Sequence, residues 1–194
     1  MTLRALALSV ALASACVGTA SLLTGCVPLV VGGAVAGGAL VVTDRRSAGA
    51  QVDDEAIELK IANNARANYN NLHLNVTSFN GIVLLSGEVP NQAAKDGIGN
   101  IAHSTDRVRS VQNDLVVAPP SSLGDRSNDT LITSKVKARF VEANEFAANH
   151  VKVVTERGVV YLMGIVSRAE ADAAARLASQ TSGVVRVVRL FEYT

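Results

Sequence analysis

The chain has 194 residues, of which 48% are hydrophobic and only 4% aromatic, and its formal net charge is +1. This balance argues against a nucleic-acid-binding protein, because such proteins need a basic surface and rings on which bases stack. The only two cysteines, Cys16 and Cys26, lie near the amino terminus, so we expect no disulfide framework.

The amino terminus has the layout of a secretory signal. Residues 1–4 carry a positive charge and residues 5–23 form an apolar run without charge. The next residues, Leu23-Thr24-Gly25-Cys26, resemble the lipobox of bacterial lipoprotein precursors. That resemblance implies a signal peptide over 1–25 and an amino-terminal Cys26 that carries the acyl and diacylglycerol groups. The alternative is an ordinary signal peptide with an incidental cysteine. Val27, where an aspartate would favour retention in the inner membrane, implies the periplasmic face of the outer membrane.

Residues 27–42 are apolar again but contain two glycine pairs. Sixteen residues are fewer than the ~20 that cross a bilayer as a helix. Glycine removes the preference for any one conformation, which favours a flexible tether, and a membrane-hugging segment is the alternative. We therefore assign residues 26–50 to the acylated terminus and its tether.

The remainder of the chain contains an internal repeat. The segment GIVLLSGEV at 81–89 aligns with GVVYLMGIV at 158–166, and VRSV at 108–111 aligns with VRVV at 185–188. Two copies of one small domain are predicted, at 51–118 and 127–194. Residues 119–126 between them are rich in Pro, Ser and Gly and are expected to form a linker. We expect two separately folded units.

The second copy shows the order of elements most clearly. Ile132, Val136 and Phe140 share one face of a helix, for which Asn128 or Asp129 supplies the start cap. Two strands follow around a turn at 156–158. A capping box at 167–170 begins a second helix that runs to about Ser182, and a last strand completes the order α-β-β-α-β.

The strand motif of each copy has a glycine at both ends. Gly81 and Gly87 bracket the first, and Gly158 and Gly164 bracket the second. At Gly87 and Gly164 the missing side chain is expected to allow close packing of a helix or a bulge.

On this motif the chain resembles the BON family of bacterial envelope domains. The resemblance implies an α+β fold with two helices packed on a three-stranded mixed sheet in each domain. Because it also has a lipobox, the chain resembles the two-domain outer-membrane lipoproteins of that family. This implies binding of anionic phospholipid, support of the outer-membrane barrier and enrichment at division sites.

A search for chemistry gives no catalytic constellation. The histidines His73, His103 and His150 form no i,i+4 pair and have no acidic residue at metal-ligand spacing. The acidic run 53–55 is expected to cap a helix start. We therefore expect no enzyme, no metal and no cofactor.

Charge separates the two copies. Residues 51–118 hold five basic and eight acidic residues, whereas residues 127–194 hold nine and seven. The second copy is thus the one expected to approach an anionic membrane. The helical wheel puts Leu131, Lys135 and Ala138 on one flank of its first helix. The predicted phospholipid-binding set is Thr130, Leu131, Lys135, Lys137, Ala138 and Arg139.

Two alternatives to this interpretation remain open. Leu131 is apolar, so it also suits a contact with the first domain or the linker, and a charge of +2 also suits a solvated face. In that case the chain is a periplasmic scaffold that binds envelope proteins and meets lipid only through its anchor.

Overall fold

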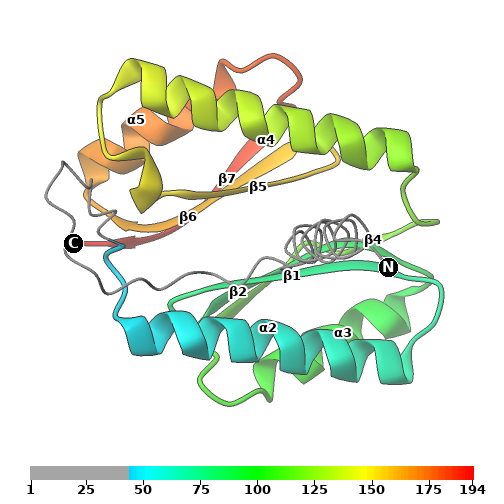
Figure 1. The fold of residues 1–194 in the computed structure, drawn as a ribbon. Coiled ribbons are helices and arrows are strands. Elements are labelled where there is room, and N and C mark those ends of the chain that lie inside the picture. Colours follow the sequence, from blue (N-terminus) through cyan, green and yellow to red (C-terminus); the bar gives the residue numbers. More distant parts are fainter. Residues whose placement is uncertain (1–43) are drawn as a thin grey trace, which may run out of the picture. The chain divides into compact units, whose positions relative to one another are not determined.

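The computed structural model describes residues 44–194, which belong to one compact unit (Figure 1). The first repeat contains α2 (Ala48–Asn68), β1 (His73–Phe79), β2 (Ile82–Val89), α3 (Gln92–His103), β3 (Ser110–Asn113) and β4 (Val116–Val117). The second contains α4 (Leu123–Ala143), the short 3₁₀ helix η1 (Ala148–His150), β5 (Lys152–Glu156), β6 (Val159–Val166), α5 (Arg168–Ser179) and β7 (Arg186–Tyr193). Both repeats confirm the predicted α-β-β-α-β order.

Each repeat forms a mixed sheet with its two helices on one face (Figure 1). In the first, β1 is antiparallel to β2, while β3 and β4 pair with β2 in parallel. In the second, β5 is antiparallel to β6, and β6 is parallel to β7. The parallel pairings need a crossover, which α3 and α5 supply. The second sheet has the expected three strands, and the first gains the short β4.

Two-residue turns set the register of both hairpins. Asn80 and Gly81 have φ angles of 51° and 75°, and Arg157 and Gly158 have 53° and 71°. Positive φ at both central residues is typical of a type I′ turn, whose twist matches that of the strands it joins. The turn predicted at 156–158 is confirmed.

A buried aspartate attaches the long helix of each repeat to the hairpin turn. Asp54 on α2 accepts hydrogen bonds from the backbone N–H groups of Asn80 (2.7 Å) and Gly81 (2.9 Å). Asp129 on α4 accepts equivalent bonds from Arg157 and Gly158, both at 2.8 Å. The two repeats thus use one device, in which a carboxylate satisfies the turn's otherwise unpaired donors.

These bonds correct two helix starts. The expectation that 53–55 and Asn128 or Asp129 cap the helices is wrong, because Asp54 and Asp129 lie within helices and bind the turns. Ser47 caps α2, and Ser122 caps α4 through a capping box with Asp125. Residues 123–126 of the expected linker are therefore helical.

The capping box predicted at 167–170 is confirmed. The hydroxyl of Ser167 accepts a hydrogen bond from the backbone N–H of Glu170, and α5 begins at Arg168. The helix ends at Ser179, three residues before the expected end at Ser182.

Gly87 and Gly164 are required for a different reason from the one expected. A Cβ at Gly87 would collide with the carbonyl oxygen of His73, and one at Gly164 with that of His150. For Gly87 the approaching backbone is the first residue of β1, and for Gly164 it is the last residue of the short helix η1, just before β5. Gly87 also has a φ of 114°, which L side chains rarely adopt.

Three apolar clusters hold the unit together. One lies inside each repeat, and a third joins the outer faces of the two sheets through Phe79, Leu84, Tyr161 and Met163. This shared cluster argues against the two separately folded units expected from the repeat, because removing one repeat would expose the apolar face of the other. We instead expect the two repeats to unfold together. The sharing of a core also supports independent folding of the fragment 44–194.

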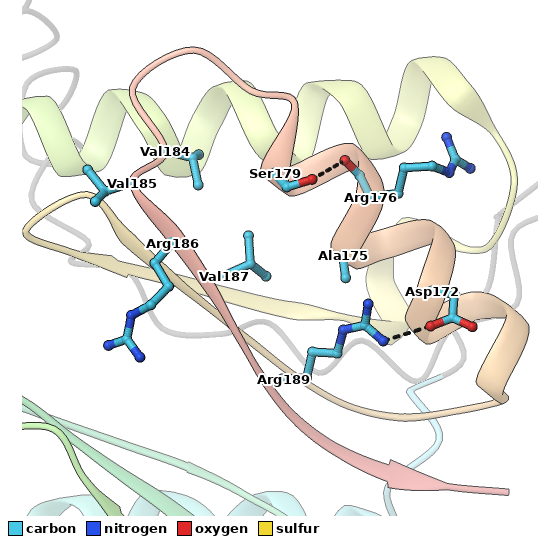
Figure 2. Close-up of a pocket in the computed structure, with 9 residues that line it drawn as sticks. All are labelled: Asp172, Ala175, Arg176, Ser179, Val184, Val185, Arg186, Val187 and Arg189. Atoms are coloured by element: carbon cyan, nitrogen blue, oxygen red, sulfur yellow. Dashed lines mark hydrogen bonds and ion pairs between the residues drawn. The ribbon is translucent and has the colours of Figure 1, made fainter.

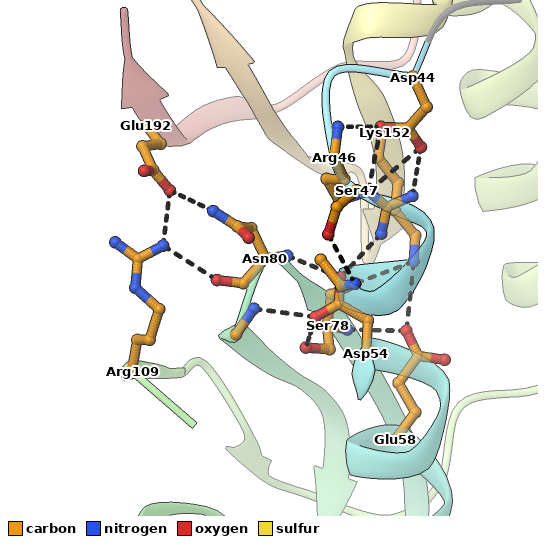
Figure 3. A network of polar contacts seen from close by, with 12 residues as sticks. Asp44, Arg46, Ser47, Asp54, Glu58, Ser78, Asn80, Arg109, Lys152 and Glu192 are labelled. Carbon is orange, nitrogen blue, oxygen red and sulfur yellow. Dashed lines mark hydrogen bonds and ion pairs between the residues drawn. The ribbon is translucent and has the colours of Figure 1, made fainter. Parts of the chain in front are cut away.

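A network of polar contacts also links the two repeats (Figure 3). The ammonium of Lys152 on β5 lies 3.2 Å from a carboxylate oxygen of Glu58 on α2. Glu192 on β7 accepts hydrogen bonds from Asn80 at 2.8 Å and Arg109 at 2.7 Å. The two outer strands of the second sheet, β5 and β7, are therefore both linked to the first repeat.

The segment before α2 is bound to both repeats. The guanidinium of Arg45 donates to both carboxylate oxygens of Glu170, at 2.8 and 2.9 Å, and to the carbonyl of Ile165 at 2.9 Å. Arg46 donates to Asp54 at 2.8 Å and lies 4.1 Å from the ring centroid of Phe79. This two-part contact is called the arginine clasp below.

We predict that Asp129→Asn lowers the free energy of unfolding by about 1–3 kcal/mol. The substitution weakens two buried bonds to the turn by removing the charged acceptor. Urea denaturation of the fragment 44–194 measures the change. Glu142→Gln, on the exposed face of the same helix, is the control and should leave stability unchanged. Equal stability of the two variants would contradict the role assigned to Asp129.

We also predict an acid-dependent contribution from the arginine clasp. The hydrogen bonds from Arg45 lower the pKa of Glu170 from 4.5 to about 2. A carboxylate whose pKa is lower in the folded state stabilises the fold fully above pH 4.5, and this contribution disappears as the pH falls towards 2. An NMR titration should show that Arg45→Gln raises the pKa of Glu170, whereas the exposed control Lys60→Gln does not. An unchanged pKa in Arg45→Gln would refute the assignment.

Candidate functional site

Helix α4 has one buried and one exposed face. Asp129, Ile132, Val136 and Phe140 are buried against the second sheet, as predicted for the three apolar residues. The helix is held at its start by the Ser122 capping box and ends at Ala143, after which the C-cap residue Asn144 adopts the left-handed conformation. Because the buried face is fixed on the sheet, the opposite face is presented outwards.

The exposed face carries apolar side chains that the packing does not use. Leu131 is 58% exposed and Val141 is 68% exposed. This exposure disagrees with the alternative in which Leu131 packs on the first domain or the linker. On a helical wheel Val141 lies about 80° from Leu131, with Ala138 between them, so the three form one apolar strip. Val141 is absent from the predicted set, although its position outside the buried arc of the helix indicates that it is exposed.

The basic residues of the predicted set differ in their availability. Lys135 and Lys137 are exposed and form no ion pair within residues 44–194. Arg139 is half-buried, and its guanidinium donates to the carbonyl of Gln180 at 2.6 Å. Arg139 therefore connects α4 to the end of α5 and is less free than the lysines.

Thr130 contributes less than the prediction implies. Its side chain is exposed, but the hydroxyl donates to the carbonyl of Arg126 one turn earlier, at 2.9 Å. The available face is thus Leu131, Lys135, Lys137, Ala138 and Val141, called the α4 outer face below.

The equivalent helix of the first repeat provides a comparison. On α2, Leu59 is also 58% exposed. The residues of α2 include four acidic and two basic side chains, whereas those of α4 include three acidic and four basic. The two helices thus share exposed apolar groups but differ in charge, and only α4 combines an apolar strip with an excess of cations.

A second basic region lies between α5 and β7 (Figure 2). It is a cavity of about 360 Å³ lined in part by Arg176, Arg186 and Arg189. Arg176 pairs with Glu145 at 2.5 Å, Arg186 with Asp114 at 3.6 Å and Arg189 with Asp172 at 2.7 Å. Each guanidinium already has a carboxylate partner, so this cavity is a weaker anion site than the α4 outer face.

One group of side chains has the composition of a metal site. His73, Glu88 and Glu156 come from three strands, and their ligand atoms all lie within 4.8 Å of one another. No metal site was expected from the sequence, because these three residues are not neighbours along the chain. The turn at Asn80-Gly81 was the missed signal, since a two-residue turn there pairs His73 with Glu88 across the hairpin.

The carboxylates of this group have different electrostatic surroundings. Burial opposes ionisation of Glu88, but hydrogen bonds from Ser121, His73 and Arg157 outweigh it and lower its pKa. Burial raises the pKa of Glu156, and the charges of Glu88 and Asp129 add to this rise. The negative charge of Glu156 is therefore less well compensated by its surroundings than that of Glu88.

The lipobox cysteine Cys26 and the apolar segment 27–42 lie outside the described residues. Within 44–194, no helix combines the length and hydrophobicity that crossing a bilayer requires.

Comparison with known proteins identifies both repeats. A family model for the BON domain matches residues 53–119 and 128–194, so each match begins one residue before a buried aspartate. The chain is 39% identical over 179 residues to the outer membrane lipoprotein DolP of Haemophilus influenzae, across 91% of this chain and 92% of that protein.

Two further relatives extend the comparison. The chain is 37% identical over 153 residues to a 21 kDa hemolysin of Actinobacillus pleuropneumoniae, across 77% of this chain and 79% of the relative. It is 34% identical over 142 residues to the osmotically-inducible protein Y of Escherichia coli, across 70% of each.

Proposed function

Because the chain belongs to the BON family, with two of its domains in tandem, we propose that it is a non-enzymatic lipoprotein that binds anionic phospholipid through its second domain. The identity to DolP supports an outer-membrane lipoprotein of this family. The proposal adds the periplasmic face, the acyl anchor on Cys26 and a role in envelope integrity at division sites. The names of the three relatives are not those of enzymes.

The observation that carries the proposal is the composition of the α4 outer face. Leu131 and Val141 are exposed beside two lysines that no carboxylate compensates within residues 44–194. An apolar side chain can enter the headgroup region of a bilayer, while each nearby cation contributes ~1 kcal/mol against an anionic surface. The short apolar strip suits shallow docking of a protein that its anchor already holds near the membrane.

We predict that Leu131→Glu abolishes binding of the fragment 44–194 to vesicles containing phosphatidylglycerol or cardiolipin. A carboxylate at this position removes the apolar group and repels the anionic headgroups. Flotation with these vesicles and with pure phosphatidylcholine vesicles measures the effect. The matched control is Leu59→Glu, which alters an equally exposed leucine on α2 and should leave binding intact.

The charge contribution is separable in the same assay. Replacing Lys135 and Lys137 together with Ala should weaken binding about thirtyfold, because two contributions of ~1 kcal/mol are lost. If the wild-type fragment does not float with anionic vesicles, the alternative function stands, in which the chain is a scaffold for envelope proteins. If Leu131→Glu floats like the wild type, α4 is not the lipid-binding helix.

We predict that Cys26→Ala leaves the precursor unprocessed by the lipoprotein signal peptidase and unlabelled by a palmitate analogue. The acyl groups are carried by the cysteine sulfur and the amino group that cleavage exposes, so alanine removes the attachment. Cys16→Ala is the control and should be processed and labelled normally. Normal labelling of Cys26→Ala would exclude the proposed anchor.

A further inference from the structure

The group formed by His73, Glu88 and Glu156 lies where the two repeats meet. His73 is on β1 and Glu88 on β2 of the first repeat, whereas Glu156 is on β5 of the second. Glu88 is fully buried and Glu156 is 5% exposed. Buried carboxylates in proteins are paired with cations or bound to metal ions. Glu88 has Arg157 as a cationic partner at 3.3 Å, whereas Glu156 has, among the described residues, only the ring of His73.

The distances suit one shared ion. The Nδ1 atom of His73 lies 3.0 Å from Oε2 of Glu88 and 3.6 Å from Oε1 of Glu156. Ligand atoms of a tetrahedral zinc ion are about 3.4 Å apart, because its bonds to nitrogen and oxygen are about 2.0–2.2 Å long. The two distances to Nδ1 bracket this value, and the two carboxylate oxygens lie within 4.8 Å of each other, so side-chain movements of about 1 Å would bring all three ligands into place.

The outer oxygens of both carboxylates are held by other side chains. Asn75 donates to Oε2 of Glu156 at 2.7 Å, and Arg157 donates to Oε1 of Glu88 at 3.3 Å. Oε1 of Glu156 and Oε2 of Glu88 point towards His73, and the backbone N–H of Ser121 donates to Oε2 of Glu88 at 3.0 Å from behind. Hydrogen bonds of this kind, from residues behind the ligands, orient the ligands of metal sites.

The local charge also favours a cation. Within residues 44–194, Glu156 forms no ion pair with lysine or arginine, and its pairing partner is the histidine ring. A neutral histidine can donate its Nδ1 hydrogen to one carboxylate only, whereas a divalent ion on Nδ1 would compensate both. A cavity of about 390 Å³, lined in part by His73 and Glu156, provides a route from solvent.

From this geometry we propose that His73, Glu88 and Glu156 bind one zinc-class divalent ion that cross-links the two BON domains, with water as a fourth ligand. The imidazole selects a borderline metal such as zinc over magnesium or calcium, which prefer oxygen ligands alone. The ion would hold β1 and β2 against β5. This site is independent of the lipid-binding surface proposed for α4.

The test uses the fragment 44–194 without a histidine tag, which contains neither cysteine of the chain. Calorimetric titration with zinc chloride at pH 7 should show one equivalent bound, and magnesium should not bind. Zinc at a hundredfold excess over its Kd should raise the Tm by roughly 5 °C or more, because the ion binds the folded state.

Variants separate this site from adventitious binding. His73→Gln should lower zinc affinity at least a hundredfold, whereas the control His103→Gln, at an exposed histidine on α3, should bind like the wild type. Glu156→Gln provides a second ligand variant if His73→Gln does not fold. The proposal is overturned if the wild type does not bind millimolar zinc, or if the control loses as much affinity as the ligand variants.

Discussion

The bond between a buried aspartate and a hairpin turn determines how each repeat is assembled. Asp54 and Asp129 accept the backbone donors of the two turn residues, and the turn in turn sets the register of the hairpin. The same carboxylate fixes the rotation of the long helix about its axis. One side chain thus links the helix, the turn and the strand pairing. Its hydrogen bonds are stronger because they are buried away from water.

This fixed rotation explains why the two long helices present different surfaces. Once Asp129 faces the turn, Ile132, Val136 and Phe140 face the sheet, and the α4 outer face is turned to solvent. The same geometry exposes Leu59 on α2. The repeats therefore share a scaffold, and the sequence of the exposed face alone decides whether a helix suits an anionic surface.

Much of the fold was predictable because it depends on local patterns. The Arg157-Gly158 turn and the Ser167 capping box involve residues that are close in sequence, and both were confirmed. The internal repeat was confirmed as well, because each copy contains its own complete set of local patterns. The helix starts were wrong because a carboxylate near an expected cap serves equally well as an acceptor for a turn that is far away in the chain. Sequence pattern alone does not distinguish these two uses of aspartate.

The lipid-binding face of α4 and the proposed metal site also differ in whether they depend on local or on distant residues. Leu131 and the lysines lie within two turns of one helix, so periodicity was enough to identify their face. The group of His73, Glu88 and Glu156 depends first on hairpin register and then on the packing of one sheet against the other. The packing of the sheets depends on Phe79, Leu84, Tyr161 and Met163. Their sequence pattern predicts that they are buried, but it does not predict which surface covers them.

The arginine clasp has a mechanical consequence. A pulling force applied to the chain at residue 44 reaches Arg45 and Arg46 before it reaches the first turn of α2. Arg45 is bonded to the start of α5, and Arg46 to the aspartate that holds the first hairpin turn. The load is therefore divided between the two domains at its point of entry, and tension on the amino-terminal side is resisted by both sheets in parallel instead of peeling α2 from one of them.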